Sequence, residues 1–73
     1  MLTVNVRMGE TESVFPAGHV IATRREGSDN VSRVECYDEH HRPITVAGKD
    51  AIEFGVVFVM NDAGKTVATF YLP

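Results

Sequence analysis

Near the start of the chain, apolar and polar residues alternate from Leu2 to Met8. A two-residue period places successive side chains on opposite faces of a strand, so that one face is buried and the other is wet. The apolar side consists of Leu2, Val4, Val6 and Met8. The alternation predicts a half-buried strand over residues 2–8.

The middle of the chain alternates between short apolar segments and polar turns. A turn over residues 9–13 is expected to precede a short extended piece at Val14–Phe15, which Pro16 and Gly18 end. Further strands are predicted over residues 20–25, 31–37 and 44–46, with a hairpin loop at residues 26–30. No segment has the length of a stable helix, and residues 49–53 favour a single turn at most.

The C-terminal third contains the clearest hairpin. Asn61–Gly64 separates two segments rich in β-branched and aromatic residues, 52–60 and 66–72. This tetrapeptide favours a type I turn with Gly64 in the left-handed conformation, closing a bulged hairpin. The predicted pairs are Met60 with Thr66, Phe58 with Ala68, Val56 with Phe70 and Phe54 with Leu72. A one-residue slip would move every one of these side chains to the opposite face.

The second face of this hairpin is also largely apolar. In the predicted register it carries Val57 and Val59, which lie opposite Thr69 and Val67, and Gly55 lies opposite Tyr71. A hairpin that is apolar on both faces must lie between two layers, curl into a barrel, or meet another chain. The predicted interface with another chain consists of Val57, Val59, Val67, Thr69 and Tyr71.

About six strands, short turns and no helix predict a single all-β domain over residues 1–73. The expected fold is a compact antiparallel meander, curled into an SH3-like or related small barrel. A chain of 73 residues buries only about 60% of the surface that its unfolded form exposes, so small domains often need a disulfide, a metal or a partner. With one cysteine, no internal disulfide forms. A second copy of the chain, forming a homodimer, or another protein is the expected source of added stability.

Charge and hydropathy narrow the function classes. The net charge of -3 argues against a protein that coats nucleic acid, because phosphate neutralisation needs a surplus of Lys and Arg. No apolar run approaches the roughly 18 residues that span a membrane, and no secretion signal is visible. The lone thiol suits a reducing cytoplasm. A cytoplasmic protein without membrane contact is expected.

Basic side chains give an alternative function. Arg24, Arg25 and Arg33, with the ring of Tyr37, form a possible binding site for a nucleotide or single-stranded nucleic acid, since small barrels bind such ligands with cationic and aromatic groups. Acidic residues are interspersed with these arginines. Ordinary cross-strand charge pairing is therefore the favoured interpretation, and nucleic acid is not the favoured partner.

One thiol and two neighbouring imidazoles are candidates for a metal site or a catalytic site. The spacing of Cys36, His40 and His41 matches no paired zinc-ligand pattern. Adjacent histidines on an extended chain also point in opposite directions, so they cannot readily bind the same metal ion. A nucleophilic Cys36 would need an orienting group and an oxyanion pocket, for which a small barrel offers little concave space. We therefore expect no metal, no cofactor and no enzymatic activity.

The segment 57–70 resembles the closing hairpin of small uncharacterised proteins encoded by bacteriophages and prophages. The resemblance covers about a fifth of the chain and consists mostly of good hairpin chemistry. It implies a short accessory protein that acts by binding, for example by blocking a host enzyme or defence complex. It assigns no functional residues.

Overall fold

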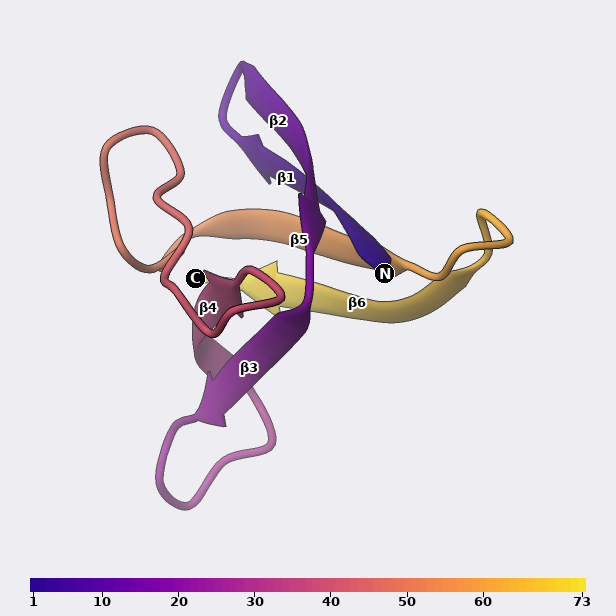
Figure 1. Cartoon of the computed structure of the whole chain (residues 1–73). Coiled ribbons are helices and arrows are strands. Elements are labelled where there is room, and N and C mark those ends of the chain that lie inside the picture. Colours follow the sequence, from indigo (N-terminus) through magenta and orange to yellow (C-terminus); the bar gives the residue numbers. More distant parts are fainter.

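The computed structural model describes residues 1–73 as six antiparallel strands (Figure 1). The strands are β1 (Leu2–Met8), β2 (Thr11–Ala17), β3 (His19–Arg24), β4 (Val31–Tyr37), β5 (Gly55–Met60) and β6 (Thr66–Leu72). The expectation of a compact all-β fold of about six antiparallel strands is confirmed. No helix in the fold is long and apolar enough to cross a membrane.

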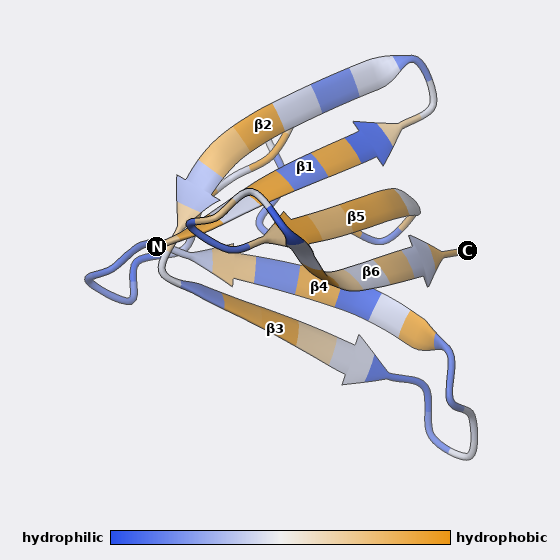
Figure 2. Ribbon diagram, turned by 90° about the vertical axis from the view of Figure 1, so that its right-hand side faces the viewer, coloured by the Kyte–Doolittle hydropathy of each residue, from blue (hydrophilic) through white to orange (hydrophobic).

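The strands form two hydrogen-bonded sheets. One sheet has four strands in the order β2-β1-β5-β6, and the other has two, β3-β4. Figure 2 shows β3 and β4 lying below the four-stranded sheet, with β4 next to β6, and these two strands are in contact. The β1–β5 pairing joins strands that are distant in sequence, so the order departs from a simple meander while the sheets enclose one core, like a small and partly open barrel.

The core is entirely apolar. In β1 the alternation predicted from the sequence holds, because Val4, Val6 and Met8 point into it. The four-stranded sheet adds Val57 and Val59 from β5. Each such side chain removed from water stabilises the fold by about 1.5–3 kcal/mol. The remaining buried residues are Ala17, Val31, Val34, Cys36, Val46 and Ile52.

A sharp corner at Gly18 carries the chain from β2 into β3, and hence from one sheet to the other. The Gly18 N–H donates a hydrogen bond to the Tyr37 carbonyl oxygen at 2.8 Å. A Cβ at this position would lie 2.7 Å from the Cα of Glu39, which is closer than carbon atoms approach. Only glycine fits at this corner, where the chain packs against the backbone that follows β4.

Several strand boundaries differ from the prediction: β3 is His19–Arg24 rather than 20–25, and β5 begins at Gly55 rather than at residue 52. The turn before β2 is only Gly9 and Glu10, so β2 begins at Thr11 and is longer than the predicted Val14–Phe15 piece. Pairing with the whole of β1 extends it, which overrides the polar character of residues 11–13. Residues 44–46 form no strand, because Val46 pairs back with Lys49 across a tight turn.

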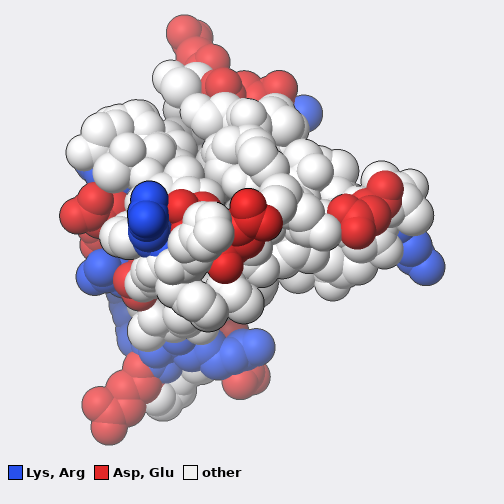
Figure 3. Space-filling view, in the orientation of Figure 1, with Lys and Arg blue, Asp and Glu red and all other residues white.

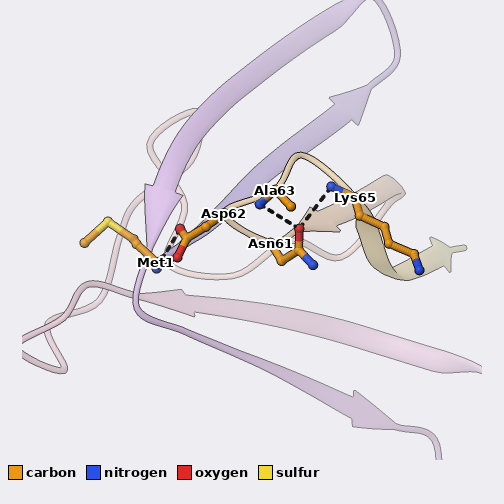
Figure 4. Close-up of polar contacts among 5 residues, drawn as sticks. All are labelled: Met1, Asn61, Asp62, Ala63 and Lys65. Atoms are coloured by element: carbon orange, nitrogen blue, oxygen red, sulfur yellow. Dashed lines mark hydrogen bonds and ion pairs between the residues drawn. The ribbon is translucent and has the colours of Figure 1, made fainter.

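The β5–β6 turn forms as the sequence predicts. Gly64 has a φ of 77° and donates its N–H to the Asn61 carbonyl oxygen at 3.0 Å. The Asn61 side-chain oxygen accepts the N–H groups of Ala63 and Lys65, each at 3.0 Å (Figure 4). The amino group of Met1 reaches across to Asp62 in the same turn, at 2.9 Å. The turn is thus fixed by its own side chain and tied to the start of β1.

Beyond this turn, the predicted register differs from the observed one by one residue. Met60 pairs with Thr66 as expected, but Val59 pairs with Ala68, so a bulge leaves Val67 without a directly opposed partner. The remaining predicted pairs are consequently replaced by Phe58 with Thr69, Val57 with Phe70, Val56 with Tyr71 and Gly55 with Leu72. The extra residue turns β6 over relative to β5, which sets the two faces of the hairpin.

Candidate interaction surface

The four-stranded sheet has one face on the core and one face toward solvent, which we call the outer face. Its members follow from the register, because directly paired residues point to the same side. A central row runs across the sheet from Val14 through Asn5 and Phe58 to Thr69. The neighbouring rows contain Glu12, Arg7, Val56 and Tyr71 on one side and Pro16, Thr3, Met60 and Thr66 on the other.

The outer face is apolar over much of its area. Tyr71 is 73% exposed and Val14 is 57% exposed, at opposite sides of the sheet. Between them the side chains of Phe58, Val56 and Met60 are half-buried. Figure 2 shows β5 as hydrophobic along nearly its whole length, although only alternate residues reach the core. An apolar face of this kind on a small monomer marks a surface that another molecule can cover.

Arg7 is a charged group beside the central row of this face. Its guanidinium carbon lies 5.7 Å from the centre of the Phe58 ring, within the range of a cation–π contact. Its Nε also lies 2.9 Å from a carboxylate oxygen of Glu12 on β2. The pair places a fixed polar group beside the aromatic ring, an arrangement typical of protein interfaces, where Arg and aromatic residues are enriched.

Asn5 is a polar residue at the centre of the outer face, as the alternation in β1 predicts. It lies on the inner strand β1, between Val14 and Phe58. Its Oδ1 is buried and is the only buried side-chain oxygen or nitrogen that lacks a hydrogen-bond partner. An unsatisfied buried acceptor costs about 1–3 kcal/mol. An unpartnered acceptor at the centre of this face is available to a donor on another molecule.

The predicted interface is only partly on this surface. Val57 and Val59 are 0% and 3% exposed, so they form the core and cannot meet another chain. The bulge at Val67 explains the correction, because it pairs Phe70 and Ala68 with these valines and turns Thr69 and Tyr71 outward. Val67 itself is 54% exposed. Phe58, Val56 and Val14 were missed, since only the bulge and the β1–β2 pairing place them beside Tyr71.

The proposed nucleotide site is not assembled. Arg24 pairs with Val31, whereas Tyr37 lies at the far end of β4, about 20 Å away at the usual rise per residue. Glu35 occupies the space between Arg33 and Tyr37: it accepts the Tyr37 hydroxyl at 2.8 Å and pairs with the Arg33 Nε at 3.5 Å. That hydrogen bond raises the pKa of the Tyr37 hydroxyl. Arg24 donates instead to the carbonyl oxygen of Asp29.

Charges over the visible surface are mixed. In Figure 3 several basic side chains gather toward the lower left of the view, with acidic side chains among and beside them. Binding of a phosphate backbone needs a concentrated positive field. The contacts of these arginines are local rather than cross-strand, since Arg33 pairs with Glu35 on its own strand and Arg24 bonds a backbone carbonyl oxygen.

The thiol and imidazoles lie apart. Cys36 is buried on the inner side of β4, and desolvation raises its pKa to about 11, which keeps the thiol protonated. His40 is exposed and lies 3.9 Å from a carboxylate oxygen of Glu39. No group of three or more His, Cys, Asp or Glu side chains is placed to hold a metal ion. A buried, protonated Cys36 is not a nucleophile.

His41 lies next to His19, at the border of an open pocket. Its ring stacks on that of His19, with centroids 4.3 Å apart and planes at 11°. Asp38 fixes the loop, because its carboxylate accepts the backbone N–H groups of Arg42 and His40, and these bonds lower its pKa. The stacked rings border an open pocket of about 500 Å³. Its other lining residues are Leu2, Gly18, Val20, Ile21 and Tyr37.

Comparison with known proteins identifies no family for this domain. No protein-family model, curated protein or solved structure matches the chain. What the outer face does is therefore inferred from its own residues.

Proposed function

We propose that this domain is a non-enzymatic protein-interaction module that binds a partner protein through the outer face of its four-stranded sheet. The observation that carries the proposal is the set of apolar side chains on this face, Val14, Val56, Phe58 and Tyr71, which the fold leaves exposed or half-buried. The partner that fits it presents an apolar surface of its own, with polar groups at the rim. The proposed compartment is a reducing cytoplasm, which suits the free thiol of Cys36.

Three features of the outer face support this role. Phe58 and Tyr71 supply large, rigid contact areas of the kind that dominates binding energy in interfaces. Arg7 lies over Phe58 and pairs with Glu12, so a cation stands beside the aromatic ring at the surface. Asn5 keeps a polar group in the centre at the expense of stability.

The class of partner is inferred from the resemblance of segment 57–70 to phage and prophage hairpins. We propose that the partner is a bacterial host protein whose activity the domain blocks by occupying an apolar surface. Inhibition of this kind needs no catalytic group in the domain. It needs only a rigid face, which the β1–β5 pairing at the centre of the sheet provides.

The test begins with a photo-reactive phenylalanine analogue in place of Tyr71, which cross-links to whatever covers the outer face in a host extract. The captured protein is then purified and its affinity for the unmodified domain is measured by calorimetry. We expect Tyr71→Lys and Val14→Lys each to weaken binding at least about tenfold, because each places a charge in a desolvated contact.

Matched controls keep this test specific. Val67→Lys changes an equally exposed valine that lies at the bulge, away from the centre of the face, and is expected to change affinity less than threefold. Circular dichroism must show all variants folded. Equal affinity of the unmodified domain and Tyr71→Lys for the purified protein would exclude the outer face as its binding surface.

A further inference from the structure

The open edge of β3 is a second uncovered feature, separate from the outer face. β3 pairs only with β4, so one of its edges has no neighbouring strand. Figure 2 shows this edge at the margin of the molecule, along the whole of β3. An unpaired edge presents backbone donors and acceptors to any extended chain that approaches it.

The hydrogen bonds of β4 identify which backbone groups are free. Val34 exchanges both of its bonds with Ile52, at 2.9 and 2.8 Å, on the side away from β3. Backbone groups alternate in direction along a strand, so the next residue, Glu35, points at its β3 partner Ile21. The same alternation directs the N–H and C=O groups of Val20 and Ala22 at the open edge. No hydrogen bond outside the paired strands uses these groups.

The β3 edge lacks the protection that the other edges have. Strand β2, the free edge of the larger sheet, contains Pro16, which has no N–H, and the charged Glu12. Strand β6 lies against β4. β3 has no proline, its one charged residue, Arg24, lies at its last position, and its central residue, Ile21, is 50% exposed. Natural sheets normally block such an edge, so an unblocked one is a place where strand pairing is favoured.

We propose that β3 pairs antiparallel with β3 of a second copy of this chain, around a two-fold axis at Ile21. In this register Val20 of each copy exchanges both backbone hydrogen bonds with Ala22 of the other. Ile21 then faces its own counterpart as a non-hydrogen-bonded pair, in which side chains come closest. The two-stranded sheet becomes a continuous four-stranded one, which relieves the marginal stability of an isolated pair of strands.

Side chains and shape agree with a second copy as the occupant. The axis places Arg24 opposite Gly18 of the other copy, which carries no side chain and lies against the backbone of residues 38 and 39. His19 lies opposite Thr23, and no like charges face each other across the strands. The open pocket of about 500 Å³ borders the edge at His19–Ile21 and gives the added strand's side chains space.

The first test is the mass in solution from micromolar to millimolar concentration, by sedimentation. We expect the unmodified chain to shift toward twice its mass of 8.0 kDa as concentration rises. Amide hydrogen exchange at Val20 and Ala22 should slow at the high concentration, whereas the Ile21 amide, bonded to β4, is protected at both. A monomer at millimolar concentration, or unchanged exchange at Val20 and Ala22, overturns the proposal.

Paired charge variants test the axis directly. Ile21→Lys and Ile21→Glu each place two like charges opposite one another and should weaken self-association at least about tenfold. Because position 21 meets itself across the axis, an equal mixture of the two variants should form a heterodimer. Failure of the mixture to associate, where the unmodified chain does, overturns the register.

The outer-face variant Tyr71→Lys is the matched control, and we expect it to self-associate like the unmodified chain. Loss of the dimer in Tyr71→Lys with retention in Ile21→Lys would move self-association to the outer face and overturn the proposal. Binding of a host protein through the outer face is measured separately. Failure of either proposal is therefore distinguishable from failure of the other.

Discussion

The two sheets of this domain leave opposite features uncovered. The four-stranded sheet has a protected free edge, with Pro16 and Glu12 on β2, but an apolar outer face. The two-stranded sheet has a polar outer side, where Arg33, Glu35 and Tyr37 bind one another, but an unprotected edge at β3. A small chain with one shared core cannot cover both kinds of surface. Each sheet therefore offers a different mode of contact, one through side chains and one through the backbone.

The largest expected effect is a difference in stability between variants on the inner and the outer side of the β5–β6 hairpin. Val59→Lys places a charge in the core between β1 and β5 and should unfold a domain of this size, at a cost of several kcal/mol. Val67→Lys, at the exposed bulge, should change stability by less than about 0.5 kcal/mol. Urea denaturation measures both. Similar stability of the two variants would contradict the assignment of β5 faces.

A second variant tests the centre of the four-stranded sheet. Gly55 has a φ of 101°, and a Cβ there would collide with the Arg7 carbonyl oxygen on β1. Gly55→Ala should cost about 3 kcal/mol, because it combines left-handed strain with loss of the β1–β5 approach. Gly64→Ala is the control: its φ is also positive, but the space around it is open, so about 1 kcal/mol is expected. Equal losses in thermal denaturation would contradict the close approach.

The variant Asn5→Val tests the role of the polar residue at the centre of the outer face. Removing the unpartnered Oδ1 should raise the free energy of unfolding by about 1 kcal/mol. If Asn5 serves partner recognition, the same variant should bind the captured host protein more weakly. The two changes have opposite signs, which distinguishes this residue from one that is merely structural. A loss of stability in Asn5→Val would show that the buried acceptor is satisfied in solution.

A pH-dependent effect is expected on the inner side of the two-stranded sheet. Burial raises the pKa of Cys36 from 9.0 to about 11, so the folded state holds the proton more tightly than the unfolded state does. The resulting stability is present below pH 9 and is lost as pH rises toward 11. Urea midpoints between pH 8 and 11 should therefore fall further for the unmodified chain than for Cys36→Ala. Parallel pH profiles would show that Cys36 is accessible.

Strand positions could be read from the sequence because alternation and turn residues act locally. The β1 alternation, the Glu26–Asn30 loop and the Asn61–Gly64 turn all appear where expected. The β1–β5 pairing could not be predicted, since it joins segments whose only shared property is an apolar face. The corner at Gly18 likewise depends on close approach to residues 38–39, which no local pattern encodes.

The prediction of the candidate surface was only partly right because β6 contains one extra residue at the bulge. Val67 reads as an ordinary strand valine, but the bulge there reverses the relation between β5 and β6. Tyr71 and Thr69 were predicted on the second face and do point outward. Val57 and Val59 were predicted with them and lie in the core. Sequence patterns fix a strand's alternation, whereas a bulge decides which half of that alternation meets the core.

The assignment of the outer face is tested most directly by cross-strand disulfides in a Cys36→Ala background. Directly opposed residues have Cβ atoms about 4.5–5.5 Å apart, close enough for oxidation, whereas residues on opposite faces cannot be bridged. Phe58→Cys with Thr69→Cys should form an intramolecular disulfide in the folded protein, and Phe58→Cys with Ala68→Cys should not. Rapid oxidation of the second pair and none of the first would contradict the register, and with it the surface that joins Phe58 to Tyr71.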